Sequence, residues 1–317
     1  MACYYKPGLN LEGQVQELSD RGLVVNDISR AEEQVRRIGY YRLSSYLHPF
    51  RQRDASAGDS GGLLNSYKPG TTLDQVLALV DYDRRLRLLM LDAVEQIETS
   101  VGARLGYALG KRSPFAHFQS FLFDESFISS YKYGAWLAKA GEAQERSHEL
   151  FVQHFDDAHG GYLPIWALTE LLDLGQLAVL YSGLKREIAT EVAQGYSVPT
   201  KALFRSWLAS INDVRNLSTH HARLFNRKLV HAPKRPKAGA IAKLEHLREP
   251  GSSKGGFGLY NVIAIMAYLL DEVDPGTTWP QQLTALVDQF PTNEHIDIDS
   301  MGFPQDWKEL DLWSASA

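Results

Sequence analysis

The chain has 317 residues, of which 44% are hydrophobic and 22% are charged, a balance typical of a globular protein that buries a substantial core. Its one cysteine, Cys3, excludes a disulfide framework and a cysteine-based metal site. A formal net charge of −5 argues against a protein that coats nucleic acid indiscriminately.

The sequence shows no sign of export or membrane insertion. The first residues lack the apolar core of a signal peptide. The longest apolar run, around Val262 to Leu270, is too short to cross a bilayer. We therefore expect a cytoplasmic protein with no membrane partner.

Helical patterns follow one another along the chain. The capping box Ser29-x-x-Glu32 predicts a helix that stops at Gly39. Thr72-x-x-Gln75 predicts a second, much longer helix, whose apolar stripe continues to Gly110. Pro164, at a first-turn position, predicts a third helix that runs to Leu184.

The remaining elements complete an all-α fold class. A helix is expected to follow Pro199 and to run to about Leu229, and the last strong helix spans 259–273. Polar, glycine-rich stretches at 54–62 and 251–256 are predicted to be loops, and no stretch shows convincing β alternation. We predict an N-terminal helical region with its loop (1–62), a helical bundle (63–273), and a C-terminal helix with an irregular tail (274–317).

The segment VRNLSTHHARLFNR, residues 214–227, concentrates polar residues on the helix predicted after Pro199. At about 100° per residue, Asn216, His220, Arg223 and Arg227 form one polar stripe, with Arg215 on its flank.

The neighbouring histidines of this segment cannot share a face, because consecutive helical residues point in different directions. His221 falls with Val214 and Phe225 on the apolar side. A histidine on an apolar face is usually a packed, hydrogen-bonded core residue. His220 is therefore the candidate for chemistry and His221 the candidate for structure, although His221 also belongs to the basic segment that could bind RNA.

The charge of the chain is unevenly distributed. Residues 201–237 hold nine Lys or Arg residues and one acid, Asp213, which gives a local charge of +8. Because the whole chain has a net charge of −5, the remaining residues together carry −13. One basic surface on an acidic body suits selective binding of a polyanion. Taken alone, such a run is more often a solvated helix face, and Arg215 and His220 could also simply tie the bundle together through buried hydrogen bonds.

These residue types suit phosphodiester chemistry. RNA carries its own nucleophile, the 2′-hydroxyl, and an imidazole can accept that proton or donate one to the departing 5′-oxygen. Arg215 would clamp the phosphoryl oxygens as negative charge builds up, and Asn216 could orient the ring or hold a phosphate oxygen. Arg223 and Arg227 would bind backbone phosphates.

Arg215-Asn216-x-x-x-His220 is similar to the R-x4–6-H signature of HEPN ribonucleases, and RNLSTHHARLFNR resembles the Abi family of bacterial abortive-infection proteins. Further stretches that resemble this family are Gly39–Tyr46, Tyr82–Arg87, Leu163–Trp166 and Met301–Trp307. The resemblance implies a HEPN-like bundle and a metal-independent endoribonuclease of antiphage defence, or a toxin, that needs no cofactor. It assigns the catalytic pair to Arg215 and His220, with a 2′,3′-cyclic phosphate and a 5′-hydroxyl as products.

A homodimer is the expected working unit. Arg215 and His220 lie five residues apart, about 140° around an ideal helix, so they do not converge naturally. Either the helix is locally distorted, or Arg215 wraps across it, or two copies of the motif face each other across a dimer axis. HEPN sites are commonly built from paired motifs, and this chain contains one copy, which favours the dimer. We expect the long helix, or the helix at 259–273, to supply the contact between copies.

Two other functions remain open. The same stripe could grip a structured or antitoxin-like small RNA without cutting it, or the chain could be a helical protein-interaction module. On the long helix, Arg84, Arg85 and Arg87 could extend the basic surface or pair with Asp81 and Asp83. Glu95 and Glu98, on the same helix, could support the arginines of the site from behind.

Overall fold

The computed structural model describes residues 8–54, 62–248 and 258–313, and within them the helices and turns are interrupted by one short β-hairpin and by irregular connections. The predicted all-α fold class is confirmed. Most of both predicted glycine-rich loops lies outside the described residues. The α-helices are α1 (Leu11–Asp20), α2 (Ile28–Ile38), α3 (Tyr40–Leu47), α4 (Leu73–Gly110), α5 (Glu125–Ile128), α6 (Tyr131–Glu145), α7 (Leu150–His159), α8 (Ile165–Leu168), α9 (Leu174–Gly183), α10 (Arg186–Gln194), α11 (Lys201–Thr219), α12 (Leu259–Val273) and α13 (Trp279–Val287).

Short 3-10 turns and the hairpin connect these helices. The turns are η1 (His48–Phe50), η3 (Ala116–Phe118), η4 (Ser120–Leu122), η5 (Thr169–Leu171), η6 (Ala242–Arg248), η8 (Ile298–Met301) and η9 (Trp307–Glu309). Strands β1 (Arg51–Arg53) and β2 (Leu63–Tyr67) pair antiparallel, with Arg51 opposite Tyr67. The hairpin was not predicted, because three residues are too few to show an alternating pattern.

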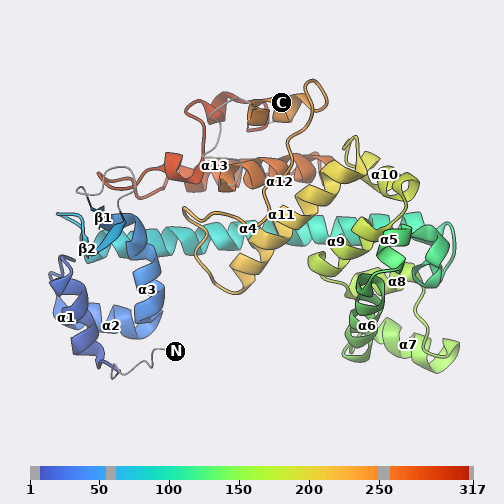
Figure 1. Ribbon diagram of the computed structural model, residues 1–317, viewed down its shortest axis with the longest axis horizontal. Coiled ribbons are helices and arrows are strands. Elements are labelled where there is room, and N and C mark those ends of the chain that lie inside the picture. Colours follow the sequence, from blue (N-terminus) through green and yellow to red (C-terminus); the bar gives the residue numbers. More distant parts are fainter. Residues whose placement is uncertain (1–7, 55–61, 249–257, 314–317) are drawn as a thin grey trace.

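Helix α4 is the spine of the molecule. The predicted capping box is confirmed: the Gln75 amide donates to the Thr72 hydroxyl (3.2 Å), and the Thr72 amide donates to the Gln75 side chain (3.0 Å). The helix runs 38 residues along the long axis, with α1–α3 and the hairpin at one end, α5–α10 at the other, and α12 and α13 beside it (Figure 1). Its predicted end at Gly110 is also confirmed.

Helix α12 forms the centre of the core. All residues from Leu259 to Leu270 are buried, so the helix is apolar on every side and must be enclosed by its neighbours. It packs against α4, α11 and η6. In the C-terminal segment, the Trp279 indole donates to the Leu89 carbonyl of α4 (2.9 Å) and thereby fixes α13 against the spine. The predicted helix at 259–273 is confirmed. The division of the chain into three regions stays a prediction.

The prediction of one continuous helix from Pro164 to Leu184 is wrong. The chain instead forms α8, the turn η5 and then α9. Asp173 begins α9 with its own capping box: its carboxylate accepts from the Gln176 amide (2.8 Å), and its amide donates to the Gln176 side chain (3.1 Å). A smaller correction applies to α2, which Asp27 caps in place of Ser29; its end at Gly39 is as predicted.

Glycines in α4 allow close packing of the segment that begins at Leu163. A Cβ added at Gly106 would lie 2.8 Å from the Thr169 hydroxyl and 2.9 Å from the Trp166 Cα atom. A side chain there would separate α4 from α8 and η5. In the part of the chain that the structure describes, no helix is both long and apolar enough to span a membrane.

Candidate functional site

Helix α11 carries the first half of the predicted site. Thr200 caps it, accepting from the Leu203 amide at 3.2 Å. Phe204, Trp207 and Ile211 are fully buried, and α11 packs against α4, α9 and α12. This buried face determines which residues remain accessible, and Arg215 and Asn216 lie half-buried at its margin.

The helix ends at Thr219, ten residues earlier than predicted, in a Schellman motif. The His221 amide donates to the Ser218 carbonyl (3.1 Å), and the Ala222 amide donates to the Leu217 carbonyl (2.8 Å). His221 takes the left-handed conformation that the motif requires, with φ of 56°. Because no glycine marks this turn, the usual stop signal of a helix is absent from the sequence here.

The early end of α11 breaks the predicted polar stripe. Asn216 lies within the helix, and His220 is its C-cap. Arg223 and Arg227 follow the turn and do not continue the same face. The prediction that one helix aligns all four residues is therefore wrong.

The prediction that His221 is a packed core residue is also wrong. Its side chain is exposed, and its left-handed φ explains its place in the fold better than packing does. We expect His221→Gly to raise the free energy of unfolding by up to about 1 kcal/mol, because glycine adopts this conformation without the steric cost of a Cβ.

His221→Val, with a branched Cβ at the same φ, is expected to lower the free energy of unfolding by about 1–2 kcal/mol. Urea titration followed by circular dichroism measures both variants. Equal stability of the glycine and valine variants would show that the turn does not depend on the residue at 221.

Arg215 and Asn216 are brought together. The Arg215 guanidinium donates to the Asn216 side-chain oxygen (3.2 Å) and lies 3.7 Å from the Asp173 carboxylate. Burial raises the pKa of the Glu98 carboxyl, and the Leu174 amide and the Arg215 guanidinium oppose this shift. Glu98 on α4 thus lies behind Arg215, as expected from the sequence.

Asn216 lines a cavity of about 670 Å³ between α6, α9 and α11. Asn212, one turn earlier, lines the same cavity. Lys132 and Lys139 of α6 and its C-cap residue Arg146 also line the cavity, and Arg146 pairs with Glu142 at 3.1 Å. Asp173 and Glu142 lie in the same lining, so carboxylates partly balance these cations.

His220 is exposed at the end of α11. Its amide donates to the Asn216 carbonyl (3.1 Å), which fixes the backbone while the imidazole stays exposed to solvent. Among the described residues, no hydrogen bond joins the His220 ring to Arg215. The Arg215 guanidinium and the His220 imidazole therefore lie at the same end of α11 but are not hydrogen-bonded to each other.

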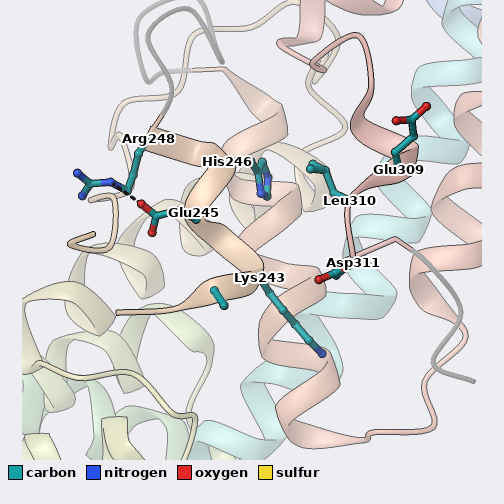
Figure 2. A pocket seen from close by; sticks show the side chains of 8 residues that line it. Lys243, Glu245, His246, Arg248, Glu309, Leu310 and Asp311 are labelled. Atoms are coloured by element: carbon teal, nitrogen blue, oxygen red, sulfur yellow. Dashed lines mark ion pairs between the residues drawn. The ribbon is translucent and has the colours of Figure 1, made fainter. Parts of the chain in front are cut away.

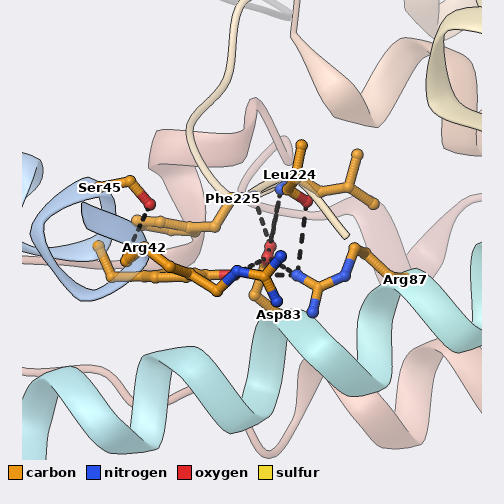
Figure 3. Close-up of polar contacts among 8 residues, drawn as sticks. Arg42, Ser45, Asp83, Arg87, Leu224 and Phe225 are labelled. Carbon is orange, nitrogen blue, oxygen red and sulfur yellow. Dashed lines mark hydrogen bonds and ion pairs between the residues drawn. The ribbon is translucent and has the colours of Figure 1, made fainter. Parts of the chain in front are cut away.

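A buried network holds the segment that follows His221. The Asp83 carboxylate accepts from the amides of Leu224 (3.1 Å) and Phe225 (2.6 Å) and from the Tyr46 hydroxyl (2.7 Å), as Figure 3 shows for the labelled residues. Arg87 pairs with the same carboxylate at 2.5 Å. Burial raises the pKa of Asp83, and the hydrogen bonds from Tyr46 and Phe225 oppose this shift. The sequence left open whether Arg87 extends the basic surface or pairs with an aspartate, and its pairing with Asp83 is confirmed.

Arg223 lies close to Asp83 and Tyr46 of this network. Burial lowers the pKa of its guanidinium, Asp83 and Tyr46 oppose that shift, and Arg227 adds to it. The Arg223 Nη1 atom is buried and has no hydrogen-bond partner in the part of the chain that the structure describes. Arg223 therefore lies near Arg227, and both follow the turn that ends α11, whereas Arg215 and Asn216 belong to the helix.

The sequence model of the Abi-like protein family matches residues 33–226, more than half of the chain. The chain belongs to this family. The match begins within α2 and ends just after the segment held by Asp83. No curated protein and no solved structure gives a significant match.

Three stretches of this Abi-like protein that suggested the family meet at one point. Gly39–Tyr46 supplies the Tyr46 hydroxyl, Tyr82–Arg87 supplies the ion pair, and residues 214–227 supply two backbone amides. Leu163–Trp166 instead packs against the glycines of α4. The convergence was not predicted, because a sequence does not show which distant segments share a hydrogen-bond acceptor.

Metal binding remains untested in this Abi-like protein. No group of three or more His, Cys, Asp or Glu side chains among the described residues could hold a metal ion. The expectation of chemistry without a metal or cofactor stays a prediction.

Proposed function

We propose that this Abi-like protein is a metal-independent endoribonuclease that acts in antiphage defence by abortive infection, or as a toxin. Membership of the family supports the biological role. The observation that carries the chemical proposal is the exposed imidazole of His220 at the end of the helix that also bears Arg215 and Asn216. The HEPN assignment of this motif is part of the proposal.

In the proposed reaction, the 2′-oxygen attacks the adjacent phosphorus and the bond to the 5′-oxygen breaks. One imidazole accepts the 2′-hydroxyl proton, and a proton is delivered to the departing 5′-oxygen. The Arg215 guanidinium stabilises the charge on the phosphoryl oxygens, which requires it to exchange its contact with Asp173 for the phosphate. The products are a 2′,3′-cyclic phosphate and a 5′-hydroxyl.

A homodimer would complete the site. One exposed His220 per chain can either accept or donate the proton in one step, and a second copy would supply the other imidazole. Helix α12 cannot form the contact between copies, contrary to one of the two expectations, because Leu259–Leu270 are buried within the chain. Helix α4 retains exposed apolar residues, among them Leu88 and Tyr107, and remains the candidate.

A second function is favoured by one specific observation. Arg215 is already engaged by Asn216 and Asp173, and His220 makes no contact with it, as in a surface that binds RNA without cutting it. Incubation of purified protein with a mixed RNA substrate in the presence of a chelator separates the two functions. Fragments that end in a 2′,3′-cyclic phosphate support the endoribonuclease, and unchanged RNA that stays bound supports the binding protein.

Arg215→Ala is expected to lower cleavage turnover by about 10²-fold or more while changing RNA affinity by only a few-fold, since its contribution belongs to the transition state. Arg227→Ala is the matched control, because it removes an exposed cation outside α11. It should weaken binding and spare turnover. Single-turnover kinetics and fluorescence anisotropy measure the two quantities. If both variants weaken binding equally and leave turnover unchanged, Arg215 has no special role in the chemical step.

A further inference from the structure

A second polar cavity, of about 800 Å³, lies at the hairpin end of the molecule. His48 of η1, the strand residues Arg51 and Arg53, and Lys68 after β2 line one side of it. Asn226, three residues after Arg223, and residues 295–297 with Ser300 complete the lining. The cavity therefore joins the segment after the R-x4-H motif to the N-terminal and C-terminal parts of the chain.

The lining carries an excess of positive charge. Arg51, Arg53 and Lys68 face one carboxylate, Asp297, whose oxygen already accepts from the Ser300 amide at 3.1 Å. No ion pair joins these three cations to an acidic residue within residues 8–54, 62–248 and 258–313. The Arg51 guanidinium instead donates to the carbonyl oxygens of Leu64 (2.6 Å) and Leu63 (2.9 Å), which are neutral and leave its charge uncompensated.

The His48 imidazole responds to this charge. Burial lowers its pKa, and the guanidinium groups of Arg223 and Arg51 lower it further. Arg223 therefore acts on the cavity although it does not line it, and its buried Nη1 atom has no hydrogen-bond partner in the described chain. Asp83, the carboxylate that acts on Arg223, already binds Tyr46, Arg87 and two backbone amides.

A different hollow shows what a charge-balanced site looks like in this protein. The hollow between η6 and the segment 309–311 has a volume of about 590 Å³ and is lined by Lys243, Glu245, His246 and Arg248 with Glu309 and Asp311 (Figure 2). Arg248 pairs there with Glu245 (3.0 Å), and Lys243 pairs with Asp271 (2.7 Å). Its cations are neutralised within the fold, so it offers no comparable attraction to an anion.

We propose that the cavity lined by His48, Arg51, Arg53, Lys68 and Asn226 binds phosphate groups of the RNA backbone, separately from the R-x4-H residues. This inference rests on the proposed function for its ligand. His220 and residues 226–228 are exposed, and Asn226 also lines the cavity, so the segment that follows the motif reaches it. A strand of RNA bound at the motif would follow this segment to the cavity. The cavity would then hold the strand in place while the motif acts on a neighbouring phosphodiester.

The test uses a fluorescein-labelled 2′-O-methyl RNA 12-mer, which lacks the nucleophile and cannot be cut, with anisotropy recorded at several salt concentrations. The double variant Arg53→Gln with Lys68→Gln removes two cavity charges and leaves the structural hydrogen bonds of Arg51 intact. Lys185→Gln with Arg186→Gln removes two exposed charges at the start of α10 and is the matched control. The logarithmic salt slope should fall by about 1.4 for the cavity variant, roughly 0.7 per lost single-strand phosphate contact, and should stay unchanged for the control.

A second measurement separates failure of the cavity from failure of the proposed function. Inorganic phosphate is titrated into the wild-type protein while the His48 ring protons are followed by NMR, with His48→Gln used for assignment. Bound phosphate should raise the pKa of His48, because it offsets Arg223 and Arg51, and the cavity variant should lose this response.

Each outcome decides the proposal. Tight RNA binding with equal salt slopes in the two double variants overturns it. No RNA binding by the wild-type protein, with a His48 response to phosphate, overturns RNA as the source of the phosphate and also removes the proposed function, while the phosphate site stands. No RNA binding and no His48 response overturn both.

Discussion

His220→Ala is expected to lower the rate of RNA cleavage by about 10²- to 10⁴-fold, the usual contribution of a positioned proton-transfer group. The physical reason is that the imidazole is the titratable side chain at the exposed end of α11, next to Arg215 and Asn216. The thermal midpoint should stay unchanged. The side chain is exposed, and the hydrogen bond to the Asn216 carbonyl comes from the backbone amide that alanine retains.

The neighbouring histidine provides the control. His221→Gly removes an exposed imidazole one residue away and preserves the left-handed turn, so cleavage should continue near the wild-type rate. Initial rates on a fluorogenic RNA, measured in a chelator across pH 5–9, compare the two variants. A folded His220→Ala protein that cuts RNA at the wild-type rate would falsify the assignment of proton transfer to His220.

Regular, local signals in the sequence predicted much of the fold. The Thr72 capping box, the apolar stripe of α4 and the uniformly apolar stretch of α12 each determine an element from its own residues, and the structure has them as predicted. Local reasoning failed where the decisive signal was short or atypical. The Asp173 capping box lies inside an apolar run, and the Schellman turn uses His221 in place of glycine.

The candidate site was only partly predictable for the same reason. A helical wheel places Asn216 and His220 correctly at the end of α11, but it assumes that the helix continues to Arg223 and Arg227. The path of the chain after residue 221 depends on Asp83, which lies 141 residues from Leu224 in the sequence. This path is determined by a tertiary contact, which no local pattern in residues 214–227 predicts.

Asp83→Asn is expected to lower the free energy of unfolding by about 3–5 kcal/mol, the usual cost of removing one partner of a buried ion pair. The variant keeps the shape of the side chain but leaves Arg87 as a buried, uncompensated cation. The substitution also replaces one carboxylate oxygen with an NH2 group, which is itself a donor. This group would face other donors, since Tyr46, Leu224 and Phe225 all donate to the carboxylate. RNA binding and cleavage should fall together in any folded fraction, because the segment that carries Arg223 and Asn226 loses its anchor.

Asp81→Asn is the matched control for Asp83→Asn, because Asp81 lies two residues earlier on α4 and is exposed. The free energy of unfolding of the Asp81→Asn variant should stay within about 0.5 kcal/mol of wild type. Urea denaturation measures both variants, and hydrogen exchange at the amides of Leu224 and Phe225 reports the anchor directly. A double-mutant cycle with Arg87→Gln isolates the coupling between the two charges. Stabilities that agree between the Asp83 and Asp81 variants, with unchanged amide protection, would show that the segment after the motif is held by hydrophobic packing of Leu224 and Phe225 alone.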